Sequence, residues 1–322
     1  MSQLRLGTRG SPLALYQAHA VASAIEAATG DTCEIVVIKT SGDRLADASL
    51  SEVGGKRLFV KEIEEALTAG DVDLAVHSSK DMPAVLPDDL FVAATLPRED
   101  PRDALVLPDG ASHADIDAVL ARLGPSPRIG TSSVRRVAQL RRMLTGAAFL
   151  PIRGNLDTRL RKLDTGEFDA IVLASAGLKR LQHGARISTL IPVQACVPAP
   201  GQGIIAVEIR RADSRLQEIL SGIDDRPAHA ALDAERTVVS TLGGGCQMPI
   251  GAHAVVEDAT IVLTALVVSL DGAHLVRSET RGTLTDASDV GARAARELLD
   301  GGAGDILAEV TRAQSAAEGK QA

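Results

Sequence analysis

The sequence predicts an α/β protein of three domains: two larger domains with mainly parallel sheets, and a small third α/β domain. Three observations predict it. The chain has 322 residues, more than one hydrophobic core usually organises. Short runs of Val, Ile and Leu alternate with segments of helical periodicity, which is typical of strand–helix–strand units. Aromatic residues make up only 2% of the chain, so aliphatic side chains must fill the core, as in parallel sheets covered by helices.

The first domain is predicted from three strands with helices between them. A strand at residues 4–6 leads to Ser11 and Pro12, a favoured N-cap and a favoured first helical residue. The unbroken aliphatic run within residues 34–40 predicts a second strand that is buried on both faces. After a further helix, a third strand is predicted over residues 72–76. The order strand, helix, strand indicates a sheet whose strands run parallel.

Two proline-containing stretches predict crossings between the first domain and a second one. Residues 97–101 form the first crossing, and prolines within residues 192–200 mark the second. A strand over residues 204–209 is predicted to return to the first domain. The second domain, between the crossings, is predicted to hold strands at residues 128–130, 149–152 and 170–174, with helices after the first two.

The pattern of strands and helices restarts at about residue 226 and predicts the third domain. We place domain 1 at residues 1–97 with 203–221, domain 2 at residues 102–197 and domain 3 at residues 226–313. The third domain is predicted to contain helices at residues 228–242, 287–299 and 304–313 and strands at residues 261–268 and 274–277.

Composition and charge exclude several classes of function. The formal net charge of −8 disfavours non-specific nucleic-acid binding, which needs a basic field. The chain has no apolar run long enough to cross a membrane, and it begins without the apolar core of a secretion signal. The three cysteines form no CxxC pair. We therefore expect a cytoplasmic protein with no metal, no membrane partner and no nucleic-acid partner.

Four turns share one pattern: a strand, then small polar residues with a cation, then the start of a helix. Free N–H groups and the helix dipole favour an anion at such a turn, and arginine adds a two-pronged grip on a carboxylate. Each turn alone is equally compatible with a helix cap beside a solvated arginine. Four of them on one sheet edge of an acidic chain favour a cleft for a polyanion. The candidate residues on these turns are Arg9, Ser11, Lys80, Ser133, Arg135, Arg136, Arg153 and Arg159.

A cysteine on a glycine-rich loop is a further candidate. Cys246 follows three glycines, which favour an exposed position, whereas Cys33 and Cys196 are interpreted as buried small hydrophobes. Exposure suits either a nucleophile or a covalent anchor, and the residue types alone give the two roles equal weight. A nucleophile of the hydrolase kind would also need a histidine partner. His77, His229 and His253 are present in the chain, but the sequence alone does not show which of them lies near this thiol.

Asp81 follows Lys80 at the end of a predicted strand. An aspartate in such a place is often only a turn or capping residue. Alternatively, its carboxylate faces the cationic cleft, where it would accept N–H bonds or stabilise a developing positive charge. The residue pattern leaves both interpretations open.

Seven segments of the chain resemble the hydroxymethylbilane synthase (porphobilinogen deaminase) family. They occur in the family's order and span nearly the whole chain, which makes the resemblance specific. The segments are residues 7–14 (GTRGSPLA), 54–62 (GGKRLFVKE), 76–83 (VHSSKDMP), 130–136 (GTSSVRR), 153–155 (RGN), 200–203 (PGQG) and 244–251 (GGCQMPIG).

The resemblance implies three α/β domains, of which the first two are similar to periplasmic binding proteins and are joined by a double crossover. It also implies a dipyrromethane cofactor held on Cys246 through a thioether, which favours the anchor over the nucleophile. The family condenses four porphobilinogen units head to tail, loses ammonia at each addition, and then releases the linear tetrapyrrole by hydrolysis. The expected partner is therefore this small-molecule substrate, and the expected oligomeric state is a monomer.

The resemblance also implies roles for single residues. Asp81 matches the family's catalytic aspartate, which would bind pyrrole N–H groups and stabilise the cation formed as ammonia leaves. Lys56 and Phe59 match a mobile loop near the cleft, where Arg57 stands in place of the family's usual glycine. The cofactor's carboxylates are expected at Lys80, Ser133, Arg135 and Arg136, and those of the incoming substrate at Arg9, Ser11, Arg153 and Arg159.

Two other classes of protein share some of these features. A two-lobed receptor for a small anion would have the same cation-lined cleft, but it would carry a secretion signal and would not need Cys246. A cysteine-dependent hydrolase would need a histidine within hydrogen-bond reach of the same thiol. The mass of the intact protein separates the three hypotheses, because only the transferase retains two pyrrole units.

Overall fold

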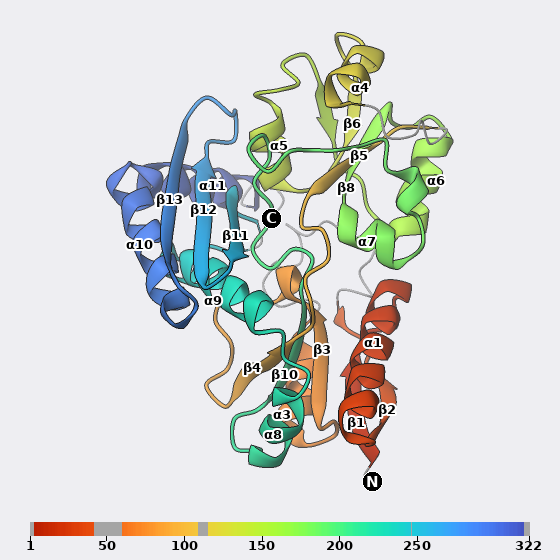
Figure 1. Cartoon of the computed structure of the whole chain (residues 1–322). Helices are drawn as coiled ribbons and strands as arrows, with labels where there is room; N and C mark the ends of the chain where they lie inside the picture. The colour runs from red at the N-terminus through yellow and green to blue at the C-terminus, as the bar shows by residue number, and fades with distance from the viewer. Residues whose placement is uncertain (1–2, 42–59, 109–114, 246, 319–322) are drawn as a thin grey trace.

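The computed structural model describes residues 3–41, 60–108, 115–245 and 247–318, and these form three sheets (Figure 1). Two five-stranded sheets build a first lobe, at the bottom of that view, and a second lobe at the top. A three-stranded sheet forms a third domain beside them. In each five-stranded sheet four strands share one direction and one runs against them. The predicted α/β class with mainly parallel sheets is therefore confirmed.

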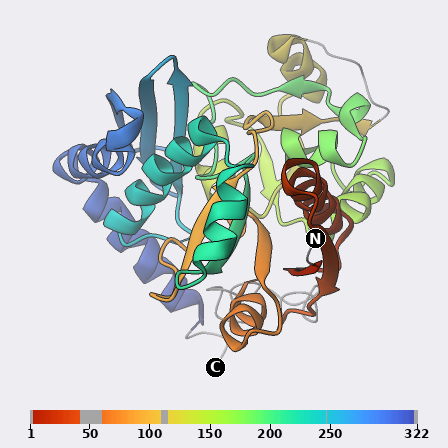
Figure 2. The ribbon, with the colours of Figure 1, turned by 60° about the horizontal axis from the view of Figure 1, so that its bottom comes forward.

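The first lobe has the strand order β2-β1-β3-β10-β4, and β10 is the antiparallel member. Helix α1 begins after Ser11, whose hydroxyl accepts the N–H of Ala14, and it ends at Gly30 in the left-handed region. Figure 2 shows the helices around this sheet. The elements are β1 (Gln3–Thr8), α1 (Pro12–Thr29), β2 (Thr32–Val37), α3 (Lys61–Ala69), β3 (Leu74–Ser78), the 3-10 turn η1 (Ser79–Asp81), β4 (Leu90–Thr95), β10 (Ile205–Arg210) and α8 (Ser214–Ser221).

The second lobe repeats this plan with the strand order β7-β6-β8-β5-β9. Strand β5 is its antiparallel member and pairs with both β8 and β9. The elements are β5 (Asp103–Val106), α4 (Ile116–Leu123), β6 (Arg128–Gly130), α5 (Val134–Leu140), β7 (Ala148–Leu150), α6 (Leu156–Asp164), β8 (Ala170–Ala174), α7 (Ser175–Arg180), the 3-10 turn η3 (Gly184–Arg186) and β9 (Thr189–Leu190).

The chain crosses between the two lobes twice. It leaves the first lobe after β4 to form β5, and it returns after β9 to form β10. Each arriving strand lies inside the sheet that it joins, so the expected double crossover is confirmed. The two crossing segments touch where the N–H of Glu99 donates to the carbonyl of Gly203 at 3.0 Å. A Cβ on Gly203 would lie 2.2 Å from the carbonyl oxygen of Glu99, so only glycine permits this approach.

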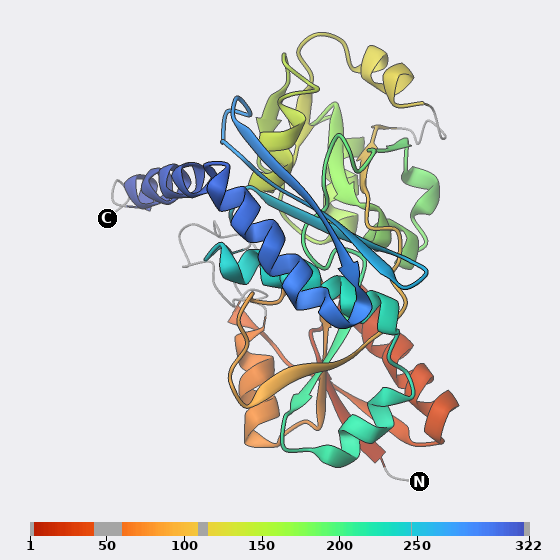
Figure 3. The same cartoon turned by 60° about the vertical axis from the view of Figure 1, so that its left-hand side comes forward.

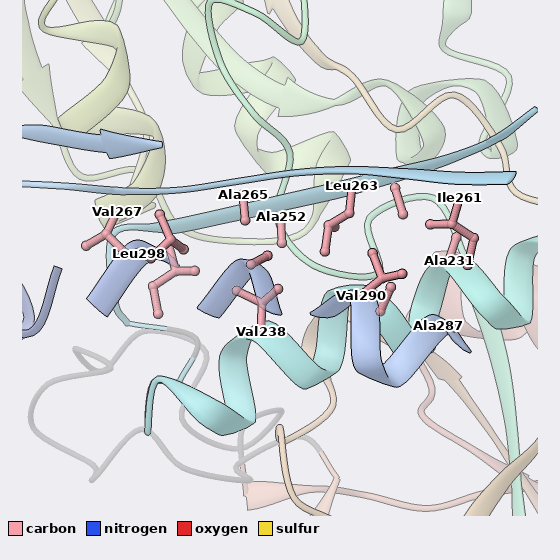
Figure 4. Close-up of a cluster of buried hydrophobic side chains, with 14 of the residues drawn as sticks. Ala231, Val238, Ala252, Ile261, Leu263, Ala265, Val267, Ala287, Val290 and Leu298 are labelled. Atoms are coloured by element: carbon pink, nitrogen blue, oxygen red, sulfur yellow. The ribbon is translucent and has the colours of Figure 1, made fainter. Parts of the chain in front are cut away.

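The third domain packs helices against one face of an antiparallel sheet (Figures 3 and 4). Its core is aliphatic: Val238 from α9, Leu263 from β12 and Val290 from α10 are fully buried and point toward one another. Each such side chain contributes about 1.5–3 kcal/mol to folding. The elements are α9 (Arg226–Thr241), β11 (Ile250–Glu257), β12 (Thr260–Val268), β13 (Leu275–Thr283), the 3-10 turn η4 (Leu284–Asp286), α10 (Ala287–Asp300) and α11 (Ala303–Glu318).

Three expectations about local structure are wrong. The strand expected at residues 274–277 continues to Thr283 as part of β13. The strand expected over residues 34–40 ends at Val37, and it is only partly buried because β2 is the edge strand of its sheet. Helix α11 continues to Glu318, beyond the end that we placed at residue 313. The predicted limits of the three domains stay a proposal, with the third extended to the end of α11.

Candidate active site

The candidate active site lies at the edge of the first lobe where β1 and β3 end. These strands are parallel neighbours, so Arg9, just after β1, and Asp81, in the turn after β3, reach the same edge. Both residues line one pocket together with Ser11, Gln17 and His77. Apolar side chains from α1 and α3 complete its walls. The pocket therefore combines cationic, carboxylate and apolar surfaces, as expected for a site that orients an organic anion.

The turn that presents Asp81 is tied to the returning crossover. The N–H of Ser79 donates to the carbonyl of Ile204 at 3.1 Å, and that of Met82 donates back to the carbonyl of Ser79. Met82 is buried, while the side chain of Asp81 is exposed and Lys80 is partly buried. The backbone of the turn is thus held rigidly, and its carboxylate remains accessible to a ligand.

The second lobe supplies arginines from the turn between β7 and α6. Asn155 caps α6, because its side chain accepts the N–H of Thr158 at 2.9 Å. Arg159, in the first turns of this helix, donates from Nε to the carbonyl of Gly154 at 2.8 Å. This bond folds the arginine back over the turn that also contains Arg153, so both guanidinium groups belong to one end of α6.

The charges of the two lobes influence one another. The pKa of Arg159 falls to about 10, because burial disfavours its charge and Arg136 and Arg153 repel it, while Asp81 raises it. Burial also lowers the pKa of Lys80, as do Arg136 and Arg159, and Asp81 acts against them. Asp81 and Lys80 come from the first lobe and the three arginines from the second, so the structure brings these predicted residues together.

The two arginines of α5 share a carboxylate that the sequence analysis did not single out. Ser133 caps this helix by accepting the N–H of Arg136 at 3.4 Å. Asp103, at the start of β5, lies 2.8 Å from Arg135 and 2.8 Å from Arg136. Arg135 also donates to the carbonyl of Val197 at 2.7 Å, which turns it toward the returning crossover. Arg136 is therefore the member of the pair that acts electrostatically on the cleft.

Three predicted residues, Lys56, Phe59 and Cys246, lie outside the described residues. Cys196 is buried as expected, whereas Cys33 is only partly buried. Burial raises the pKa of Cys196 to about 12 and that of Cys33 to about 11. Both therefore remain thiols near neutral pH, which makes neither a good nucleophile.

Two pocket residues were missed by the sequence analysis. Gln17 is 3% exposed, and its amide nitrogen has no hydrogen-bond partner within the described part of the chain. It interrupts the buried face of α1 next to Ala18 and Val21, and such a polar residue in an apolar stripe is the signal that would have found it. His77 lies with Nε2 2.9 Å from a carboxylate oxygen of Glu208, and both side chains are buried.

Protein cations of both lobes predominate around Asp81. In the ranges that the structure describes, no three His, Cys, Asp or Glu side chains are grouped so that they could hold a metal ion. No helix in the same ranges is long and apolar enough to span a membrane. The fold and the site together define a two-lobed α/β protein in which cations from both lobes surround one carboxylate.

Comparison with known families identifies this class more closely. The family model described as "Porphobilinogen deaminase, dipyromethane cofactor binding domain" matches residues 4–218, and the model of the family's C-terminal domain matches residues 230–300. The chain therefore belongs to the porphobilinogen deaminase family. The family is one of transferases, and the segment that forms the two lobes is its dipyrromethane cofactor-binding domain.

Curated relatives match the chain over almost its full length. The porphobilinogen deaminase of Syntrophobacter fumaroxidans is 46% identical over 311 residues, covering 96% of this chain and 98% of the relative. That of Moorella thermoacetica is 47% identical over 316 residues, covering 98% of each chain.

Solved structures with a similar fold include bacterial binding domains. The second substrate-binding domain of a putative amino acid ABC transporter from Streptococcus pneumoniae gives a TM-score of 0.43 at 15% identity, covering 69% of this chain and 92% of that one. A periplasmic domain of Bordetella pertussis BvgS gives a TM-score of 0.38 at 19% identity, covering 69% of this chain and 86% of that one. These similarities are too distant to bear on function.

Proposed function

We propose that this chain condenses four porphobilinogen molecules head to tail into the linear tetrapyrrole hydroxymethylbilane. In each addition a carbon–carbon bond forms between pyrrole units and ammonia leaves. Hydrolysis finally releases the product. Family membership over the whole chain supports this activity. The single structural observation that carries it is the cluster of cations from both lobes around the exposed carboxylate of Asp81.

The residues that are present fit a dipyrromethane cofactor. Each of its pyrroles carries an acetate and a propionate, so it is a polyanion. Besides burial, Arg136 and Arg159 lower the pKa of Lys80, and Arg136 and Arg153 lower the pKa of Arg159, which means that these positive charges repel and that a bound polyanion would relieve the repulsion. We assign its carboxylates to Lys80, Arg136 and Ser133, with Arg135 behind them, and its thioether to Cys246. When bound, the cofactor supplies the pyrrole carbon to which the first substrate is joined.

The substrate is expected to bind beside Asp81. Arg9 and Ser11 line the same pocket in the first lobe. In the second lobe, the charge of Arg159 interacts with those of Asp81 and Arg153. Guanidinium groups hold carboxylates by two parallel bonds, so these residues would fix the acetate and propionate of porphobilinogen.

Asp81 is proposed as the catalytic residue. Its carboxylate would accept the pyrrole N–H and stabilise the positive charge that develops as ammonia leaves. A fixed carboxylate in a cleft that is otherwise cationic concentrates this stabilisation at one position. Proton transfer at the carbon that joins the chain is a second task that the same carboxylate can perform.

The intact mass of the purified protein tests the proposal. Protein made in cells with a working pathway should exceed its sequence mass by two pyrrole units, and Cys246→Ser should abolish the excess. Cys33→Ser is the control, because that thiol lies on the edge strand β2 and should leave the excess unchanged. A mass equal to the bare sequence would contradict the proposal and would favour a receptor for a small anion or a cysteine-dependent hydrolase.

The partners and location that we propose are those of a small-molecule enzyme. We propose a cytoplasmic monomer whose partner is porphobilinogen and which has no nucleic-acid or membrane partner. The net charge of −8 supports the exclusion of nucleic acid.

A further inference from the structure

The carboxylate of Asp103 is fully buried where the first crossover becomes β5. Arg136 donates to its Oδ1 from Nε at 3.0 Å and from Nη2 at 2.8 Å, and Gln202 donates to the same oxygen at 2.9 Å. Near Oδ2, Nη1 of Arg135 lies at 2.8 Å and the thiol of Cys196 donates at 3.4 Å. One carboxylate therefore joins helix α5 to both crossing segments.

The charges around Asp103 explain why it can be buried. Two guanidinium groups and one carboxylate leave the cluster with a net positive charge. Burial raises the pKa of Asp103, but Arg135 and Arg136 outweigh burial and hold the pKa well below its usual range. Burial also raises the pKa of Cys196 to about 12, so its thiol stays protonated and donates. The cluster is thus a stable arrangement of donors around one acceptor.

Arg136 connects this cluster to the cleft. Its charge lowers the pKa of both Lys80 and Arg159. Among the residues that the structure describes, Asp103 and the carbonyl of Val172 occupy three of its five N–H groups, which leaves two for another acceptor. A guanidinium that is already fixed on one side loses less freedom when it binds a ligand.

We propose that Asp103 is a positioning residue of the cofactor site. By binding both arginines of α5, it fixes the orientation in which Arg136 meets the carboxylates of dipyrromethane. The inference rests on the proposed function, and Asp103 acts through Arg136 without touching the cofactor. Because the same carboxylate also holds Gln202 and Cys196, the orientation of Arg136 is tied to the segments that connect the lobes.

The test compares Asp103→Asn with Gln139→Leu. Asparagine keeps the shape of aspartate, but its NH₂ group faces the donors of the arginines, so Arg136 loses its fixed orientation. Gln139 is buried on the same helix and exchanges two hydrogen bonds with Val197, at 3.0 and 2.7 Å. Gln139→Leu therefore loosens α5 from the returning crossover without touching a guanidinium group.

The readouts are the Tm and the fraction of folded protein that carries the two pyrrole units by intact mass. We expect both variants to lower the Tm and only Asp103→Asn to lower the loaded fraction, by about tenfold, as for other groups that orient a ligand-binding side chain. Loading of Asp103→Asn equal to that of the parent protein would overturn the inference. An equal loss in Gln139→Leu would also overturn it, because packing would then suffice.

A second variant covers the case in which Asp103→Asn does not fold. Asp103→Glu keeps the charge but displaces the carboxylate by one methylene group, so we expect folded protein with a reduced loaded fraction. Full loading of that variant would refute the positioning role. The parent protein distinguishes this inference from the proposed function. If the parent protein lacks the added mass, the proposed function is wrong. If the parent protein and the Asp103 variants are all fully loaded, only the positioning role of Asp103 is wrong.

Discussion

The exposed carboxylate of Asp81 stands among cations of both lobes and raises the pKa of Lys80 and of Arg159. A positive charge that develops on the substrate would therefore meet a carboxylate that is already in place. Asp81→Asn keeps the shape of the side chain and removes its charge. We expect a folded protein whose kcat falls by about 100- to 1,000-fold, measured as tetrapyrrole formed at saturating porphobilinogen.

Asp88→Asn is the control for this variant, because Asp88 is also exposed in the first lobe but does not line the pocket. It should retain normal turnover. Near-normal turnover in Asp81→Asn would remove Asp81 from the catalytic role and leave it as a turn residue.

Gln17 places a buried amide in the wall of the same pocket. A buried amide without a partner in the described residues costs about 1–3 kcal/mol unless a ligand satisfies it. Since Gln17 lines the pocket with Arg9 and Asp81, the substrate is the expected partner. Gln17→Leu should raise the KM for porphobilinogen while the Tm stays equal or increases. His19→Leu, on the exposed side of the same helix, should change neither quantity; an unchanged KM in Gln17→Leu would show that the amide does not meet the substrate.

At the scale of elements, the end of α6 determines where the substrate arginines lie. Asn155→Ala removes the cap that accepts the N–H of Thr158, which costs about 1 kcal/mol of stability. Because Arg153 and Arg159 flank this cap, the KM for porphobilinogen should rise as well. Asp115→Ala removes the corresponding cap of α4 and should lower stability alone. Denaturant titration measures the loss of stability, and steady-state kinetics measure the rise in KM. An unchanged KM in Asn155→Ala would show that this helix cap does not position the substrate-binding arginines.

Some elements were predictable from local patterns because their physical cause is local. Ser11 and Pro12 predicted the start of α1, since capping and the fixed φ of proline act within one turn. The edge position of β2 was not predictable, because an aliphatic run does not reveal whether a second strand covers it. Strands β4 and β5 were missed for a related reason: their partners are distant in sequence. Strand β11 was missed although it pairs with the next strand, β12, across a tight turn.

The candidate site was predictable to the extent that it lies on turns with a sequence signature. Arg9 and Asp81 follow neighbouring parallel strands of one sheet, and topology alone brings such positions to one edge. Arg159 belongs to the other lobe, so the four turns expected on one sheet edge are divided between two sheets. Asp103 was missed because its role comes from two arginines and a glutamine that only the folded chain places around it. The sequence of residues 97–101 predicted a domain crossing, but no local pattern indicated that the strand after it would begin with a buried aspartate.

At the scale of the whole molecule, one buried carboxylate joins the three domains. Glu235 of α9 is fully buried and accepts a hydrogen bond from Arg98 of the first crossover at 2.6 Å. It also accepts the N–H of Gly201 in the returning crossover at 2.6 Å and that of Ala254 in the third domain at 2.7 Å. The domain that carries the cysteine loop is therefore held against the same crossing segments that connect the lobes.

Removing the charge of Glu235 should leave the partly buried guanidinium group of Arg98 with carbonyl acceptors but without its carboxylate partner. We expect Glu235→Gln to cost about 3–5 kcal/mol in the free energy of unfolding, measured by denaturant titration at neutral pH. Asp169→Asn is the control: it breaks an exposed pair with Arg128 and should cost no more than about 1 kcal/mol. If Glu235→Gln lowers the free energy of unfolding by as little as the control does, the hydrogen bonds of Glu235 do not hold the third domain against the crossing segments.

The stability that the carboxylate of Glu235 contributes should decrease at low pH. Burial raises the pKa of Glu235, but Arg98 and His253 outweigh burial and bring the pKa below its ordinary value of 4.5. A carboxyl group of this kind stabilises the fold above its ordinary pKa and loses that contribution as the pH falls through the lowered value. The Tm difference between the parent protein and Glu235→Gln should therefore be constant near neutral pH and should narrow below about pH 4.5. If this Tm difference widens as the pH falls, the carboxylate of Glu235 is not the charged group that stabilises the contact with Arg98.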